Sequence, residues 1–156
     1  MTHKVTCASF NNQKHVFDSK DLTFRQSVYG IIIDNNKVLL NKHIKYPKYQ
    51  LPGGGIEIHE DIKAALHREI MEETGIKVKI QKFLTFKEGF FFWNLDNAWH
   101  SFLFYYKCKP LTTETQIIAD KEIIEASWVD IHSLKPEDFM NYGKFIIKLI
   151  NSISSC

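Results

Sequence analysis

Between Asp61 and Thr74, apolar and polar residues recur with the period of an α-helix. Successive helical residues advance by about 100° around the axis, so each residue can be assigned to one side. The apolar side holds Ile62, Ala65, Leu66 and Ile70, and the opposite side holds Lys63, His67, Met71 and Thr74. Gly75 follows, and glycine commonly ends a helix in a left-handed turn. The pattern predicts an amphipathic helix over residues 61–74.

Runs rich in β-branched and aromatic residues predict the strands of a sheet. The expected strands cover residues 28–33, 37–41, 77–87, 90–93, 99–107 and 124–129. Turn-forming residues at 34–36 and at 94–97 join two pairs of these strands as β-hairpins. A polar loop is expected over residues 110–121.

The two ends of the chain differ in pattern. Residues 1–24 are polar and mixed, with β-like pieces at 5–10 and 15–17, and form an N-terminal extension that can add an edge strand. Near the other end, Pro136 suits the start of a helix. Apolar residues then recur at helical spacing: Tyr142, Phe145, Ile146, Leu149, Ile150 and Ile153. Residues 25–156 therefore predict one α/β domain, a mixed sheet between helices.

Composition excludes several classes of protein. The 156 residues are 44% hydrophobic and 24% charged, with a net charge of +2, as in an ordinary soluble domain. No basic run marks a nucleic-acid tail, and no apolar stretch approaches the roughly 20 residues that span a membrane. The cysteines Cys7, Cys108 and Cys156 share no metal-like or redox-like spacing, which indicates reduced thiols in a cytoplasmic protein.

Three glutamates share a sector of the predicted helix with its apolar side chains. Glu69, Glu72 and Glu73 lie one or two turns further along than the apolar set. Like charges at this spacing destabilise a helix by roughly 0.2–0.5 kcal/mol per pair, and a divalent cation that takes oxygen ligands would relieve the repulsion. Arg68 supplies a fixed cation beside Glu69. The glycine run at 53–55, which favours a loop, lies just ahead; a solvated acidic face is the alternative.

These residues together resemble a complete Nudix box. Gly54 is followed after five residues by Glu60 and after seven more by the run 68–76, which reads REIMEETGI. The family pattern G-x5-E-x7-R-E-U-x-E-E-x-G-U, with U a bulky aliphatic residue, is matched at every fixed position. The resemblance implies an α/β/α sandwich that cleaves a nucleoside diphosphate linked to another group, through attack of water on phosphorus.

The resemblance also suggests roles for the box residues. We expect Glu69, Glu72 and Glu73 to bind Mg²⁺ or Mn²⁺, two or more ions during turnover, together with the backbone carbonyl of Gly54 or its neighbour. Arg68 would orient Glu69. Glu57 and Glu60 would act at the edge of the site, towards substrate or metal-bound water, or as structural partners.

An additional carboxylate is expected from the loop before the last strand. Better-known members of the family move a glutamate from this loop to the metal site. Spacing to Trp128 makes Glu122 the closest match, with Glu125 or Glu114 as the other choices. The general base is either a box glutamate or Glu122.

Substrate contacts are expected from two segments. The basic, aromatic stretch 42–49 places Lys42, Lys45 or Lys48 where each can meet phosphates. The aromatic hairpin offers rings that can stack on a base: Phe90, Phe92, Trp93, Trp99 and His100. We select Lys42, Phe92 and Trp99 as the predicted contacts.

The substrate itself stays open within this class. A nucleoside triphosphate, oxidised or not, is preferred, and the alternatives are ADP-ribose, a dinucleotide polyphosphate, a nucleotide sugar or a capped RNA end. A phosphate-binding P-loop is excluded because no Gly-Lys-Ser/Thr follows the glycines. A non-catalytic sensor of this fold typically lacks box glutamates, and a prenyl diphosphate isomerase needs a cysteine near the box. Family members are often homodimers, which sets the expectation for this chain.

Overall fold

The computed structural model describes residues 2–154, which form a mixed β-sheet and two α-helices. The strands are β1 (Lys4–Ala8), β2 (Lys14–Asp18), β3 (Leu22–Asp34), β4 (Lys37–His43), β5 (Tyr49–Gln50), β6 (Gly53–Gly55), β7 (Val78–Asn94), β8 (Asn97–Pro110) and β9 (Ile123–Asp130). The α-helices are α1 (Ile62–Thr74) and α2 (Gly143–Ser154). Short 3₁₀ helices cover Ser19–Asp21, Ile131–Ser133 and Pro136–Asp138.

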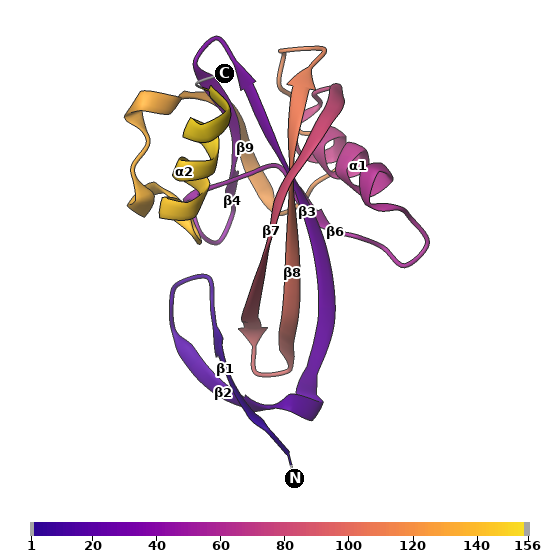
Figure 1. Cartoon of the computed structure of the whole chain (residues 1–156), viewed down its shortest axis with the longest axis vertical. Coiled ribbons are helices and arrows are strands. Elements are labelled where there is room, and N and C mark those ends of the chain that lie inside the picture. Colours follow the sequence, from indigo (N-terminus) through magenta and orange to yellow (C-terminus); the bar gives the residue numbers. More distant parts are fainter. Residues whose placement is uncertain (1, 155–156) are drawn as a thin grey trace.

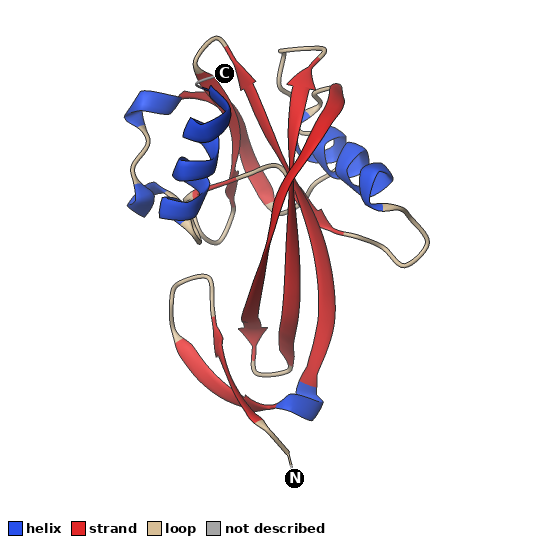
Figure 2. Ribbon diagram, in the orientation of Figure 1, coloured by secondary structure: helices blue, strands red, loops and turns tan. Residues whose placement is uncertain are grey.

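The sheet lies between the two α-helices. Its strand order is β2-β1-β7-β8-β3-β4-β5, with β6 paired to β3 and β9 paired to β4. Figure 1 shows α1 against one side of the long strands and α2 against the other, and Figure 2 shows the same layers by type of structure. One apolar core fills the space beneath α1, around Leu66 and Ile70, and a second lies beneath α2, around Ile146 and Ile150. The predicted α/β/α sandwich is confirmed.

Helix α1 begins and ends where the sequence predicted. The side chain of Asp61 accepts hydrogen bonds from the backbone N–H groups of Lys63 and Ala64, both at 2.9 Å, and so caps the first turn. Gly75 has a φ of 70° and donates its N–H to Met71. The assignment of Thr74 to the outer side was wrong: Thr74 is fully buried, and its hydroxyl is satisfied by donating to the Ile70 carbonyl at 2.6 Å.

The long strands extend further than the sequence pattern indicated. β3 begins at Leu22 and pairs in parallel with β8 from Leu22–Ala98 to Ile32–Cys108. β7 is one strand from Val78 to Asn94 rather than two runs, and its register against β8 shifts three times. The predicted break at residues 88–89 is not a break in the ladder: Glu88 pairs with Phe102 and Gly89 with Ser101. A charged residue followed by glycine suggested a strand end there, but pairing with β8 carries the strand through both.

Residues 4–18 form a β-hairpin at the edge of the sheet. β1 pairs antiparallel with β2, and Ala8 pairs in parallel with Phe91 of β7. We name the small core beneath this hairpin the hairpin cluster; its buried members are Cys7, Phe17, Phe92 and Ala98. Figure 1 shows the hairpin beside the lower half of β7.

The C-terminal region needs one correction. Pro136 starts a separate 3₁₀ helix over Pro136–Asp138, and α2 begins only at Gly143. The intervening residues follow β5 instead: Met140 donates its N–H to the Tyr49 carbonyl at 3.0 Å. This contact fixes the backbone in an extended form that a longer helix would lose.

Two composition-based expectations can be compared with the described residues. Cys7 and Cys108 are buried free thiols, whereas Cys156 lies outside residues 2–154. Within residues 2–154, neither α-helix has the length and apolar character needed to cross a lipid bilayer.

Candidate active site

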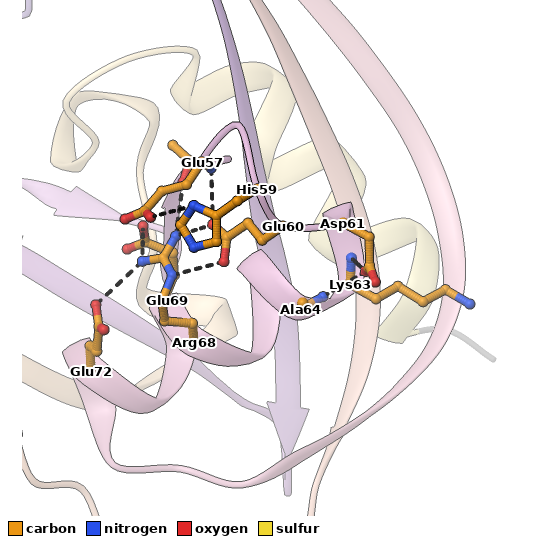
Figure 3. A network of polar contacts seen from close by, with 10 residues as sticks. Glu57, His59, Glu60, Asp61, Lys63, Ala64, Arg68, Glu69 and Glu72 are labelled. Carbon is orange, nitrogen blue, oxygen red and sulfur yellow. Dashed lines mark hydrogen bonds and ion pairs between the residues drawn. The ribbon is translucent and has the colours of Figure 1, made fainter.

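Arg68 lies at the centre of a network of carboxylates in the candidate site (Figure 3). Its Nε donates to Glu60 at 3.0 Å and its Nη2 to Glu60 and to the carbonyl of Gly55, while Nη1 donates to Glu69 at 2.8 Å and approaches Glu72 at 3.4 Å. The guanidinium lowers the pKa of Glu60 to about 2, and the carboxylates raise the pKa of Arg68. Arg68 therefore ties the loop before α1 to the acidic end of the helix.

Glu69 lies against the glycine strand β6. A Cβ atom added to Gly54 would lie 2.8 Å from the carboxyl carbon of Glu69, so any larger residue would displace that carboxylate. Burial raises the pKa of Glu69, the nearby charge of Glu72 adds to the effect, and the ion pair with Arg68 opposes it. The box glycine and the box arginine thus fix one carboxylate from two sides.

Glu73 is the most buried of the three helix glutamates, at 4% exposure. Its Oε2 accepts hydrogen bonds from the backbone N–H of Gly53 at 2.8 Å and from Nδ2 of Asn41 at 2.7 Å. Burial nevertheless raises the pKa of Glu73 well above its ordinary value, and the charges of Glu69 and Asp120 raise it further. No cation offsets this charge among the contacts described.

Five carboxylates line one cavity of about 680 Å³. They are Glu69, Glu72 and Glu73 from α1, and Asp120 and Glu122 from the loop before β9. The same cavity is lined by Arg25 of β3 and by the indole rings of Trp93 and Trp99. Arg25 is the single lysine or arginine among the described residues of this lining, and its guanidinium lies 4.8 Å from the ring centre of Trp99.

The carboxylates do not form a finished ligand shell. Within residues 2–154 no group of three or more His, Cys, Asp or Glu side chains is arranged to hold a metal ion. Glu69 and Glu72 contact Arg68, and Glu73 accepts its two hydrogen bonds from Asn41 and Gly53. The donor set still fits a hard divalent cation, because it consists of carboxylate oxygens gathered at one cavity wall.

The three choices for the extra carboxylate lie in different surroundings. Glu122 lines the cavity with its side chain 70% exposed, and its carboxylate lies 3.4 Å from Nε2 of His43. Glu125 instead pairs with Lys42 at 3.0 Å and accepts a hydrogen bond from Ser127. Glu114 is exposed in the preceding loop and is not among the residues of the cavity wall.

Of the predicted substrate contacts, one lies in the cavity wall and the others lie outside it. Trp99 lines the cavity, but Phe92 is buried in the hairpin cluster and Lys42 is paired with Glu125. Glu57 is exposed and lies 3.4 Å from His59, outside the cavity wall. Phe92 was selected because one helix cannot bury both faces of the aromatic hairpin, but the N-terminal hairpin covers the face that carries it.

Four residues near the carboxylates were missed by sequence reasoning: Phe10, Arg25, Asn41 and Asp120. Asn41 is fully buried, and its Oδ1 has no hydrogen-bond partner among the described residues. The available signal was an asparagine directly after three apolar residues of the predicted strand 37–41, since a buried amide needs partners. The other three lie in polar stretches, where nothing in the local sequence distinguishes them.

The chain is similar to known proteins over most of its length. The family model described as NUDIX domain matches residues 23–149. A Caenorhabditis elegans protein that carries a nudix hydrolase name is 28% identical over 121 residues, which are 76% of this chain and 31% of that protein. An ADP-ribose pyrophosphatase of Methanocaldococcus jannaschii is 43% identical over 61 residues, 37% of this chain and 36% of the relative. This chain therefore spans about a third of these curated relatives.

Solved structures show the same fold. A MutT NUDIX hydrolase from Burkholderia pseudomallei superposes with a TM-score of 0.68 at 19% identity, covering 82% of this chain and 98% of that chain. The family match includes the whole box, the glycine strand β6 and the loop that carries Asp120 and Glu122. The chain therefore belongs to the Nudix family.

Proposed function

We propose that this protein is a divalent-metal-dependent hydrolase that cleaves the pyrophosphate bond of a nucleoside diphosphate linked to another group. One observation carries the proposal: a single cavity is lined by five carboxylates and also by Arg25, Trp93 and Trp99. The carboxylates can hold cations, and the arginine and the rings can hold the phosphates and base of a nucleotide.

Glu69, Glu72 and Glu73, with the carbonyl of Gly54, would hold Mg²⁺ or Mn²⁺. Such ions neutralise the charge of a pyrophosphate and lower the pKa of a bound water. Burial raises the pKa of Glu69 although its ion pair with Arg68 opposes the rise, and burial raises the pKa of Glu73 further above its ordinary value. This is the electrostatic state expected of a site shaped to receive positive charge.

Arg68 acts as a positioning residue in this proposal. It holds the Glu69 carboxylate at 2.8 Å while Glu60 and the Gly55 carbonyl hold the guanidinium itself. The contact with Glu60 is bidentate, and such a charge-assisted pair fixes the guanidinium in one orientation, from which Nη1 reaches Glu69. A lysine at this position would keep the positive charge but lack the planar set of N–H donors, so it could not contact Glu60 and Glu69 in the same arrangement.

The attacking water needs a proton acceptor. A box glutamate can serve, and so can Glu122, whose exposed carboxylate lies at the cavity beside His43. Glu122→Gln separates the two choices: if Glu122 is the base, kcat falls by about 100-fold and the acidic limb of the pH profile is lost. If a box glutamate is the base, that limb stays in place.

The experiment that tests the proposal is hydrolysis of a substrate panel with Mg²⁺ or Mn²⁺. The panel holds nucleoside triphosphates (8-oxo forms included), ADP-ribose, a dinucleotide polyphosphate, a nucleotide sugar and an RNA with a 5′-triphosphate or NAD cap. We place nucleoside triphosphates first, cleaved to the monophosphate and pyrophosphate. Identification of the released phosphate species assigns the bond that is cut.

Two glutamate variants give the matched comparison. Glu73→Gln removes the buried carboxylate of the cavity and should lower kcat by roughly 100-fold or more. Glu57→Gln makes the same change in the same motif, at an exposed position outside the cavity wall, and should leave kcat within about twofold. Near-normal turnover by folded Glu73→Gln would contradict the assignment, as would hydrolysis that is insensitive to chelation of the metal.

A further inference from the structure

Phe10 brings the N-terminal hairpin into the candidate active site. It lies in the loop between β1 and β2, and its ring lines the cavity of the carboxylates. It also lines an adjoining cavity of about 120 Å³, whose wall includes Arg25, Trp99 and Tyr105. Because the family match begins at residue 23, Phe10 comes from a segment outside the matched domain.

The loop that carries Phe10 is held in one conformation. Ser9 donates its N–H to the Gln13 carbonyl at 2.8 Å, and its hydroxyl accepts from the Gln13 N–H at 3.1 Å. Asn12 completes the turn with a positive φ of 64° and donates to the Ser9 carbonyl at 3.0 Å. The hairpin cluster anchors both strands below this turn. Because the turn already fixes this loop, binding of a ligand to the Phe10 ring should cost little conformational entropy.

Phe10 is part of an aromatic wall rather than of the closed core. Its ring centre lies 5.5 Å from Trp93 in an edge-on arrangement, and 6.3 Å from Phe91 in a stacked one at 9°. Tyr46 lies at 6.3 Å. The side chain is only half-buried, so part of its surface faces the cavity. Such a wall provides flat apolar surface of the kind on which nucleobases stack.

The same wall also offers groups that can read a base edge. Gln50, Asn94 and Asn97 line the cavity together with Phe10 and Trp93. Asn97 donates through its Nδ2 to Oδ1 of Asn94 at 2.8 Å, which leaves the Asn94 amide nitrogen and the Asn97 amide oxygen as the groups of this pair that can meet a base. An amide can both donate and accept hydrogen bonds, which suits the edge of a heterocycle, whereas an ionised phosphate chain only accepts. The aromatic wall and the carboxylates therefore divide the cavity between a base and a metal-bound pyrophosphate.

We infer that Phe10 is a specificity-determining residue that packs against the base of the nucleotide, so that the hairpin β1–β2 selects the substrate of the neighbouring domain. The inference deepens the proposed function and rests on it. It assigns the substrate class as one with a nucleobase, rather than a sugar or inorganic polyphosphate alone.

Equilibrium binding tests the inference without requiring turnover. Calorimetry measures the Kd of AMP, GMP, CMP, UMP and ribose 5-phosphate for the full chain and for three variants. Phe10→Leu keeps apolar bulk in the turn and removes the ring, Phe10→Tyr restores a ring, and Phe24→Ala removes a 70%-exposed ring that lies outside the cavity wall. Thermal unfolding checks that each variant is folded.

We expect at least one monophosphate to bind more tightly than ribose 5-phosphate. Phe10→Leu should weaken binding of that monophosphate by about tenfold, or about 1.4 kcal/mol, which is within the range measured for one base–ring stack. Ribose 5-phosphate should bind equally to all variants, Phe10→Tyr should restore the affinity, and Phe24→Ala should match the parent chain. Unchanged affinity in folded Phe10→Leu, equal weakening of ribose 5-phosphate, or no preference for any base would each overturn the inference.

The binding test of Phe10 and the hydrolysis test of the proposed function can fail independently of each other. If the chain shows metal-dependent hydrolysis and Phe10→Leu binds the monophosphates as the parent chain does, the proposed hydrolase stands and the inferred role of the hairpin is wrong. Base-selective binding that depends on Phe10, without hydrolysis of any panel member, would keep the inferred base site and remove the hydrolase.

Discussion

The two α-helices pack on opposite faces of one sheet and differ in what they bury. α2 covers its side with apolar residues such as Ile146 and Ile150. α1 has nearly the same length, yet its inward side carries Glu73 beside Leu66 and Ile70. One helix is thus built for packing alone, whereas the other gives up part of its packing surface to charge. Both faces of the sheet carry an apolar core, and the buried carboxylate of Glu73 lies on the face covered by α1.

The largest expected effect comes from the packing helix. Ile150→Ala removes a fully buried side chain and should lower the free energy of unfolding by about 2–5 kcal/mol, measured by urea denaturation. The folded fraction should keep its kcat, because α2 supplies none of the cavity carboxylates. Lys148→Ala, an exposed change on the same helix, should stay within about 0.5 kcal/mol. Loss of kcat at full folding would break the division between the helices.

The opposite sign is expected on α1. Glu73→Gln should raise the free energy of unfolding at pH 7 by about 1 kcal/mol or more when divalent ions are chelated, because it removes a buried charge that no cation offsets. The glutamine oxygen can still accept from Gly53 and Asn41. A variant that is less stable than the parent chain would show that the hydrogen bonds of Glu73 outweigh its burial.

The pH dependence of that difference has a defined direction. The pKa of Glu73 is higher in the folded chain than its ordinary value of 4.5, so the folded state resists ionisation. Below pH 4.5 both states are protonated, and Glu73 contributes nothing through its charge. Above that pH the unfolded chain ionises first, and the parent chain loses stability relative to Glu73→Gln as the pH rises. Denaturation curves of both proteins between pH 4 and 8 measure this widening gap.

Bound divalent ions should offset the destabilisation that the buried charge of Glu73 causes in α1. At ten times its Kd, Mg²⁺ stabilises the folded chain by about 1.4 kcal/mol, which corresponds to a rise in Tm of roughly 3–6 °C. The rise should be smaller in Glu73→Gln and unchanged in Glu57→Gln. Sodium chloride at equal ionic strength is the control for screening. An equal rise with sodium would place the effect outside the site.

The smallest effect concerns the start of α1. Asp61→Ala removes a cap that accepts from two backbone N–H groups and should lower the free energy of unfolding by about 1 kcal/mol. Asp61→Asn should recover most of this loss, because asparagine is an equally good cap. An effect of Asp61→Asn as large as that of alanine would indicate that charge, rather than hydrogen bonding, matters at this position.

Local chemistry explains what could be read from the chain before folding. Asp61 and Gly75 bound α1 through contacts within a few residues, so the sequence alone locates both ends. The pairing of Arg68 with Glu69 is also a contact between neighbours in sequence. The fold class followed because apolar periodicity reports directly on which face of each element is buried.

Contacts between distant residues account for most of what was missed. Asn41 meets Glu73 across 32 residues, and Lys42 meets Glu125 across 83. No local pattern decides whether a lysine will face a phosphate or a glutamate. Phe92 was misplaced for the same reason, because the hairpin that covers it is formed by residues more than 70 positions earlier. Topology, rather than propensity, set these outcomes.

Labelling of the buried thiol of Cys7 can report how often the N-terminal hairpin opens. The thiol is fully buried in the hairpin cluster, and burial raises its pKa, so an alkylating reagent can reach a reactive thiolate only when the hairpin opens. Cys108, beneath α1, has its pKa raised to about 12 by burial and responds to a different opening. The rate at which Cys7 is labelled therefore measures how often the wall that carries Phe10 leaves the cavity.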